Sequence, residues 1–147
     1  LDTTPHDAAL TEVTAGSALL CPHLFDYYEQ VQFLPACFFA LSVVRASDPG
    51  FVTCAGGGYI ASGEPGWDRV PVPAWPEGLE LVSSEGCGEV QTPLKTAGAK
   101  VGLGDVVLFR HAKAGEVMER FSEVALVEGG AVTARVPTYR GLGACFF

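Results

Sequence analysis

The sequence predicts a mainly β fold, a closed or nearly closed β-barrel of short strands, preceded by a short α/β unit. The 147 residues include 18 glycines and 10 prolines, too many for a helical bundle. After residue 33, short apolar runs recur with turn signals between them, as in an all-β barrel. Because 48% of the residues are hydrophobic and only 18% are charged, the chain can bury one ordinary core.

The first 32 residues predict the α/β unit. Thr4 can cap a short helix whose first position suits Pro5. Residues 11–15 then predict a strand, which the Gly-Ser pair at 16–17 ends. A second helix is predicted over residues 22–30. A strand enclosed by two helices is typical of an α/β layer and not of a β-sandwich.

The remaining chain predicts the strands of the barrel. Two apolar runs, 38–45 and 51–55, flank the turn signal Asp48-Pro49-Gly50 and predict a hairpin. A tight turn at 128–130 predicts a second hairpin. Further strands are predicted at 79–83, 88–92, 105–110, 121–127 and 131–136.

A proline-rich stretch interrupts the strands at residues 61–78. It holds four prolines together with Trp67 and Trp75, and it predicts a long irregular loop. Such a loop is either a stiffened surface connection or a binding element. The sequence leaves both interpretations open.

Charge and composition exclude several classes of partner. The net charge of −8 disfavours nucleic acid, whose phosphates an acidic surface repels. The longest apolar stretch, 33–44, is broken by Pro35 and Ser42, so no membrane span is predicted. The five cysteines are scattered without a C-x-x-C pair, and no signal peptide opens the chain. We therefore expect a cytoplasmic protein with reduced cysteines.

Two glycine turns could approach a phosphate or another ligand. Gly16 and Ser17 offer backbone N–H groups and a hydroxyl at the end of a predicted strand. The triplet 56–58 permits a close backbone approach, but it lacks the residues of a P-loop. A strand end or a bulge is the simpler explanation of this triplet.

Titratable residues gather at two further places. His111 and Lys113 lie at the end of a predicted strand and share one strand face, where they could serve acid–base or metal chemistry. Glu85 and Glu89 surround a flexible turn and could bind a metal. A hydrogen-bonded histidine and a solvated turn are the plain alternatives.

Several segments, in order, resemble one enzyme family. The stretch Thr11-Glu12-Val13-Thr14-Ala15-Gly16-Ser17 resembles the phosphate-binding strand of alanine-racemase-like, fold-type III enzymes that use pyridoxal 5'-phosphate. The segments 84–94, 104–107, 110–116 and 137–141 resemble the D-threonine aldolase and D-serine dehydratase branch, including proteins called amino acid deaminase/aldolase. The resemblance covers essentially the whole chain.

The resemblance implies a two-part enzyme. An N-terminal (β/α)8 barrel carries the lysine to which the cofactor attaches, and a C-terminal β domain closes over the cofactor, usually in a homodimer. Residues 1–32 would then be the C-terminal end of that barrel, and residues 33–147 the β domain. The chain lacks the lysine-bearing part, so we expect it to be inactive alone.

The family's site residues fall on four positions. Its phosphate-binding pair falls on Gly16 and Ser17, and its metal-binding histidine falls on His111. The second metal ligand of the family, Cys or Asp, is replaced by Lys113, whose ammonium repels a divalent ion. The usual zinc or manganese is therefore in doubt. We expect His111 and Lys113 to face the substrate, with the ammonium supplying part of the missing charge.

The resemblance implies a pyridoxal-phosphate-dependent lyase that acts on D-configured β-hydroxy amino acids by aldol cleavage or dehydration. Amino acid racemisation is a rival on the same fold. A non-enzymatic β-barrel module that binds a ligand or protein through residues 61–78 is a rival of another class, as is a protein that only carries the cofactor.

Overall fold

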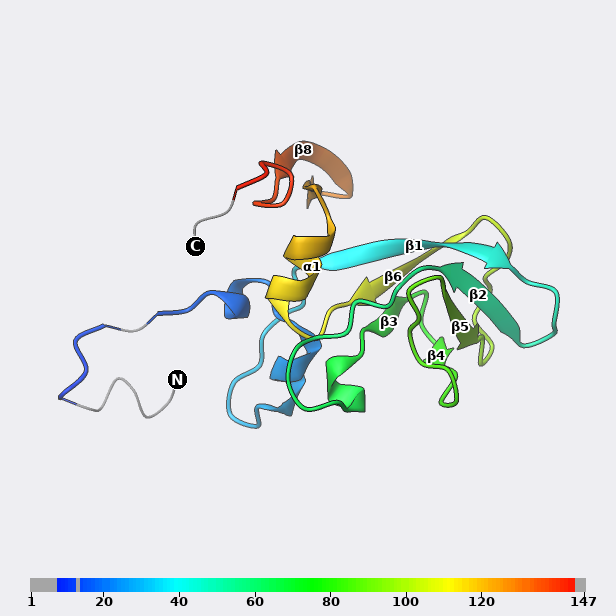
Figure 1. Ribbon diagram of the computed structural model, residues 1–147, viewed down its shortest axis with the longest axis horizontal. Helices are drawn as coiled ribbons and strands as arrows, with labels where there is room; N and C mark the ends of the chain where they lie inside the picture. The colour runs from blue at the N-terminus through cyan, green and yellow to red at the C-terminus, as the bar shows by residue number, and fades with distance from the viewer. Residues whose placement is uncertain (1–7, 13, 145–147) are drawn as a thin grey trace.

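The computed structural model describes residues 8–12 and 14–144, and this part of the chain is mainly β (Figure 1). It contains eight strands, one α-helix and three short 3-10 helices. In chain order the elements are η2 (Ser17–Leu19), η3 (His23–Tyr27), β1 (Phe38–Arg45), β2 (Phe51–Ala55), η4 (Trp67–Arg69), β3 (Val72–Trp75), β4 (Glu80–Leu81), β5 (Gln91–Lys95), β6 (Val106–Arg110), α1 (Ala114–Arg120), β7 (Glu123–Glu128) and β8 (Ala131–Pro137).

Six strands form one antiparallel sheet in the order β3-β6-β1-β2-β5-β4. The two edge strands, β3 and β4, contact each other, so the sheet curls into a nearly closed barrel. Closure leaves few unpaired strand edges, which is the usual reason that short antiparallel strands adopt this form. The predicted barrel is therefore confirmed.

The barrel interior is filled by alternate residues of its strands. Along β1, Phe39, Leu41 and Val43 are buried while their neighbours are exposed, as a period of two requires. Phe109 on the paired strand β6 stacks on Phe39 with ring centroids 5.4 Å apart. The other core residues are Val52, Cys54, Leu79, Leu94, Val107 and Val117.

The hairpin predicted around Asp48-Pro49-Gly50 joins β1 to β2 and is confirmed. Gly50 has a φ of +81°, a left-handed conformation that a side chain would strain. Its carbonyl accepts a hydrogen bond from the Thr96 N–H at 2.8 Å, which ties the turn to the end of β5.

The proline-rich stretch 61–78 is more regular than predicted, because it contains η4 and strand β3. Pro73 lacks a ladder donor, but β3 is an edge strand paired only with β6, and an edge tolerates proline. The strand predicted at 88–92 lies instead at Gln91–Lys95, because residues 88–90 belong to the preceding turn.

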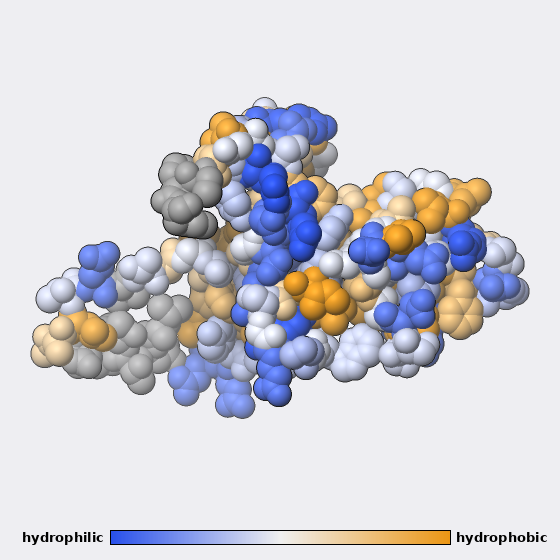
Figure 2. Space-filling view, viewed as in Figure 1, coloured by the Kyte–Doolittle hydropathy of each residue, from blue (hydrophilic) through white to orange (hydrophobic). Residues whose placement is uncertain are grey.

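Helix α1 was not predicted, and it follows the last barrel strand directly. Its Ala114 and Val117 are buried, and Val117 belongs to the barrel core. Hydrophilic side chains gather over its outer face (Figure 2). The helix therefore covers one end of the barrel next to the end of β6.

Strands β7 and β8 form a separate two-stranded sheet. The predicted turn is confirmed, since Gly129 and Gly130 have φ values of +57° and +80°, which a type I′ hairpin turn requires. All of β8 and all of β7 except Val124 are exposed. This hairpin therefore lies outside the barrel core.

The N-terminal segment is less regular than predicted. The helix predicted from Thr4 falls largely outside the described residues. The described residues of the predicted strand 11–15 form no strand, because no strand of the described chain lies beside them to supply ladder hydrogen bonds. The helix predicted at 22–30 shrinks to the 3-10 turn η3. The division into domains at residue 32 stays a prediction.

Within the residues that the structure describes, no helix combines the length and the apolar character that crossing a bilayer would need.

Candidate functional site

The segment 17–28 is fastened to the end of β6. Arg110 donates two hydrogen bonds to the Asp26 carboxylate, at 2.6 and 2.8 Å, and another to the Cys21 carbonyl at 3.3 Å. The N–H of His23 donates to the His111 carbonyl at 3.0 Å. These contacts place residues distant in sequence side by side and make one wall of a hollow.

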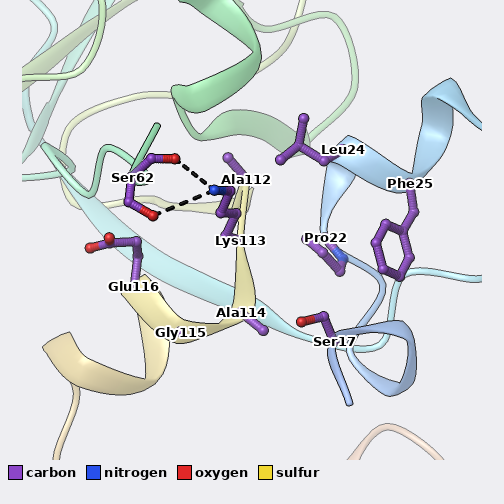
Figure 3. Close-up of a pocket in the computed structure, with 10 residues that line it drawn as sticks. All are labelled: Ser17, Pro22, Leu24, Phe25, Ser62, Ala112, Lys113, Ala114, Gly115 and Glu116. Atoms are coloured by element: carbon purple, nitrogen blue, oxygen red, sulfur yellow. Dashed lines mark hydrogen bonds between the residues drawn. The ribbon is translucent and has the colours of Figure 1, made fainter. Parts of the chain in front are cut away.

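The hollow has a volume of about 370 Å³ and lies between segment 17–25 and the start of α1 (Figure 3). Most of its surface is apolar, and four residues bring polar side chains: Ser17, Ser62, Lys113 and Glu116. The other lining residues are Pro22, Leu24, Phe25, Ala112, Ala114 and Gly115. An apolar hollow with a few polar groups is the usual form of a small-molecule site.

Lys113 brings a positive charge to this hollow. Its Nζ donates a 2.7 Å hydrogen bond to the Ser62 carbonyl and contacts the Ser62 hydroxyl at 3.4 Å. Both contacts are drawn in Figure 3, where Ser62 and Lys113 lie on the side of the hollow opposite Pro22 and Phe25. The ammonium is thus held in place, while no described carboxylate forms an ion pair with it.

His111 lies beneath the hollow and does not line it. Its side chain is 1% exposed. Burial lowers the pKa of His111 to about 4; the nearby Cys37 carbonyl opposes the shift, and the Arg110 and His23 charges add to it. Neither ring nitrogen reaches a described partner in hydrogen-bond geometry. The imidazole is therefore neutral at pH 7, and the prediction that it faces the substrate beside Lys113 is not supported by its position.

Gly16 and Ser17 lie at the start of η2 on the other side of the hollow. The Ser17 side chain lines the hollow, whereas Gly16 is exposed with open space where a Cβ would stand. Within the described chain, the N–H groups of Gly16, Ser17 and Ala18 donate no hydrogen bond. Free N–H groups beside a hydroxyl are groups that can bind the oxygens of an anion.

A divalent metal does not fit the residues present. The described residues contain no group of three or more His, Cys, Asp or Glu side chains arranged to hold a metal ion. At the position where the second ligand would stand, Lys113 places an ammonium. The described residues therefore offer no ligand set for zinc or manganese.

The other sequence candidates lie elsewhere. Neither Glu85 nor Glu89 lines the hollow. Gly57 packs so closely on β5 that a Cβ would come within 2.4 Å of the Thr92 hydroxyl oxygen, so a packing role explains this glycine. Sequence reasoning missed Ser62 and Glu116 as site residues. Ser62 lies in the stretch 61–78, for which the sequence predicts only an irregular loop. Glu116 faces the hollow because α1 begins at Ala114, a helix that the sequence did not predict.

Comparison with known proteins places the fold. No protein-family model matches the chain, and no curated protein matches it in sequence. Among solved structures, the chain is similar to the crystal structure of D-threonine aldolase from Filomicrobium marinum, with a TM-score of 0.61 and 21% sequence identity. The match covers 76% of this chain but only 30% of that one. It therefore shows a related fold, and the chain spans less than a third of that protein's length.

Proposed function

We propose that the chain is the C-terminal β portion of a longer pyridoxal-phosphate-dependent lyase that acts on D-configured β-hydroxy amino acids. Residues 1–32 would be the end of its (β/α)8 barrel, and residues 33–147 its β domain. The observation that carries the proposal is that Ser17 and Lys113, distant in sequence, line the same hollow in a fold similar to that of a D-threonine aldolase.

Gly16 and Ser17 would hold the cofactor phosphate through free N–H groups and the serine hydroxyl. When bound, pyridoxal phosphate supplies an electron sink for the carbanion that develops on an amino acid substrate. The apolar residues Pro22, Leu24 and Phe25 would exclude water from that end of the hollow.

Lys113 would lie next to the substrate as a fixed positive charge, held by Ser62. Such a charge stabilises negative charge that develops on a β-oxygen or rests on a carboxylate. His111, neutral and buried, would support the strand end that carries Lys113. A direct catalytic role for His111 stays a prediction.

The chain by itself would be inactive. Of its three lysines, Lys95 and Lys100 are exposed away from the hollow, and Lys113 is engaged by Ser62. None of the three is therefore placed to form the covalent bond to the cofactor. In the proposed full-length enzyme, an N-terminal barrel would supply that lysine. We further propose a homodimer, and a cytoplasmic location in keeping with the free cysteines at positions 21, 37, 54 and 87.

The test is a screen of D-amino acids with the full-length protein, scored for aldehyde, keto acid and ammonia, while cofactor absorbance is recorded. Aldehyde from D-threonine, or keto acid and ammonia from D-serine, would support the lyase. Inversion of stereochemistry without cleavage would identify a racemase instead. Cofactor absorbance that no amino acid alters would identify a carrier, and an absence of cofactor binding would contradict the proposal.

A further inference from the structure

The outward face of three neighbouring strands, β3, β6 and β1, is apolar. Leu108 on β6 pairs with Trp75 of β3 on one side and with Ala40 of β1 on the other, so the three residues form one row across the strands. Ala40 and Leu108 alternate with buried residues along their strands, and Trp75 is 58% exposed, so the row points away from the core. The outer apolar face consists of this row and four neighbours with large exposed fractions: Phe38 (42%), Val44 (53%), Leu103 (71%) and Val106 (42%).

The outer apolar face is large enough for the centre of a protein–protein interface. The exposed fractions of its side chains correspond to roughly 500 Å² of apolar surface. A patch of that size is about as large as the largest on a typical monomer, and such patches often mark an interaction site. Each copy in a stable dimer buries about 800 Å², of which about 65% is apolar in homodimers, or about 500 Å². The face therefore supplies the apolar area that such an interface requires.

Charge favours a second copy of the chain on this face. Among the outward side chains of β3, β6 and β1 up to Val44, Arg110 is the only charged one. Its guanidinium donates to the Asp26 carboxylate at 2.6 and 2.8 Å, so this charge is paired. Over the rest of their surfaces, two copies of a chain with a net charge of −8 repel each other. An uncharged face lets them meet without like charges in contact.

We propose that two copies of the chain pack face to face through the outer apolar face, about a two-fold axis that runs along β6. Such an axis places β3 of each copy over β1 of the other, and therefore Trp75 of each copy over Ala40 of the other. The largest side chain of the row thus meets the smallest, and the two Leu108 side chains meet at the axis. Sheets that pack in this way keep their strands within about 30° of each other. Because the face is complementary to itself, it fits a second copy of the same chain.

This inference assigns an interface to the proposed homodimer, and it does not rest on the lyase activity, because the face belongs to the barrel. The experiment measures the dimer dissociation constant of the full-length protein by sedimentation equilibrium. Trp75→Ala should raise this constant by about thirtyfold or more, as expected for a tryptophan at the centre of an interface. Ala40→Trp should raise it as well, because two tryptophans then compete for one space. The double variant exchanges the large and the small side chain and should restore the dimer.

A second variant tests the axis itself. Val106→Glu brings two carboxylates together next to the axis and should also separate the copies. The position is 42% exposed in the single chain, so the variant should fold, which urea denaturation checks. Trp67→Ala is the matched control, because Trp67 is 56% exposed but lies in η4, outside the three strands.

Two results would overturn the inference. One is a protein that stays monomeric at all concentrations, and the other is a dimer that neither Trp75→Ala nor Val106→Glu weakens. Turnover of D-amino acids by such a protein would overturn the interface and keep the lyase. A dimer that Trp75→Ala weakens and the double variant restores, without turnover of any amino acid, would keep the interface and count against the lyase.

Discussion

The barrel and the β7–β8 hairpin are built from similar residues but hold together differently. In the barrel, Val107 and Phe109 are fully buried in a shared core. In the hairpin, Val127 and Val132 are 65% and 57% exposed, although they are paired in the antiparallel ladder of β7 and β8. A two-stranded ribbon is marginal by itself in water. β-branched residues at strand positions therefore stabilise this protein most where the six strands of the barrel bury them.

The largest effect is expected from the barrel core. Phe109→Ala removes a fully buried ring that stacks on Phe39, and it should lower the free energy of unfolding by about 3–5 kcal/mol. Urea denaturation of the chain measures this. A loss below about 1 kcal/mol would mean that the barrel does not enclose the ring as described.

A pH effect is expected at the junction between the barrel and the hollow. Burial lowers the pKa of His111 from 6.5 to about 4, so the unfolded chain takes up this proton before the folded chain does. The neutral His111 makes its full contribution to the free energy of unfolding above pH 6.5. As the pH falls toward 4, this free energy decreases by up to about 3 kcal/mol.

The control for this pH effect is His111→Gln. Its unfolding free energy should fall less than that of the wild type between about pH 7 and about pH 4, because the titrating group is gone. Equal losses in the two proteins would show that other groups, such as the buried His23, cause the acid sensitivity.

A smaller effect is expected where segment 17–28 joins the barrel. Asp26→Asn weakens the two hydrogen bonds that Arg110 donates to this side chain. The Asp26 side chain is 53% exposed. The loss of stability should be about 1 kcal/mol or less, because solvent screens the pair. Limited proteolysis of the connection before β1 should accelerate, and an unchanged rate would mean that the other contacts of the segment suffice.

The smallest effect is expected in the hairpin, through a matched pair of substitutions. Val107→Thr puts a hydroxyl into the barrel core, whereas Val132→Thr makes the same change at an exposed strand position. The first should cost about 1–3 kcal/mol and the second less than about 0.5 kcal/mol. Similar losses would show that the hairpin is covered by another surface in solution.

The sequence predicts the barrel well because its signals are local. The alternation of Phe39, Leu41 and Val43 and the glycines at positions 50 and 129 reflect single strands and turns. Strand β3 was missed because proline disfavours a strand away from a sheet edge, and the sequence does not tell which strand is at an edge. Helix α1 was missed because its seven residues include Gly115 and no side-chain cap.

The candidate site is only partly predictable for a related reason. Ser17 and Lys113 were singled out from the sequence, but Ser62 reaches the hollow through tertiary packing, which leaves no local pattern. The burial of His111 also depends on segment 17–28, which the Arg110–Asp26 ion pair holds against the end of β6. The strand predicted at 11–15 depends on partner strands that the described chain does not supply.

The central claim is our proposal that Ser17 and Lys113 lie on opposite sides of one cofactor site. The most direct measurement is the dissociation constant for pyridoxal phosphate of the full-length protein carrying Ser17→Asp, against the control Ser83→Asp, which changes an exposed serine outside the hollow. A new carboxylate beside the phosphate should weaken binding by about tenfold or more, while the control binds like the wild type. Equal affinity in the two variants would contradict the claim.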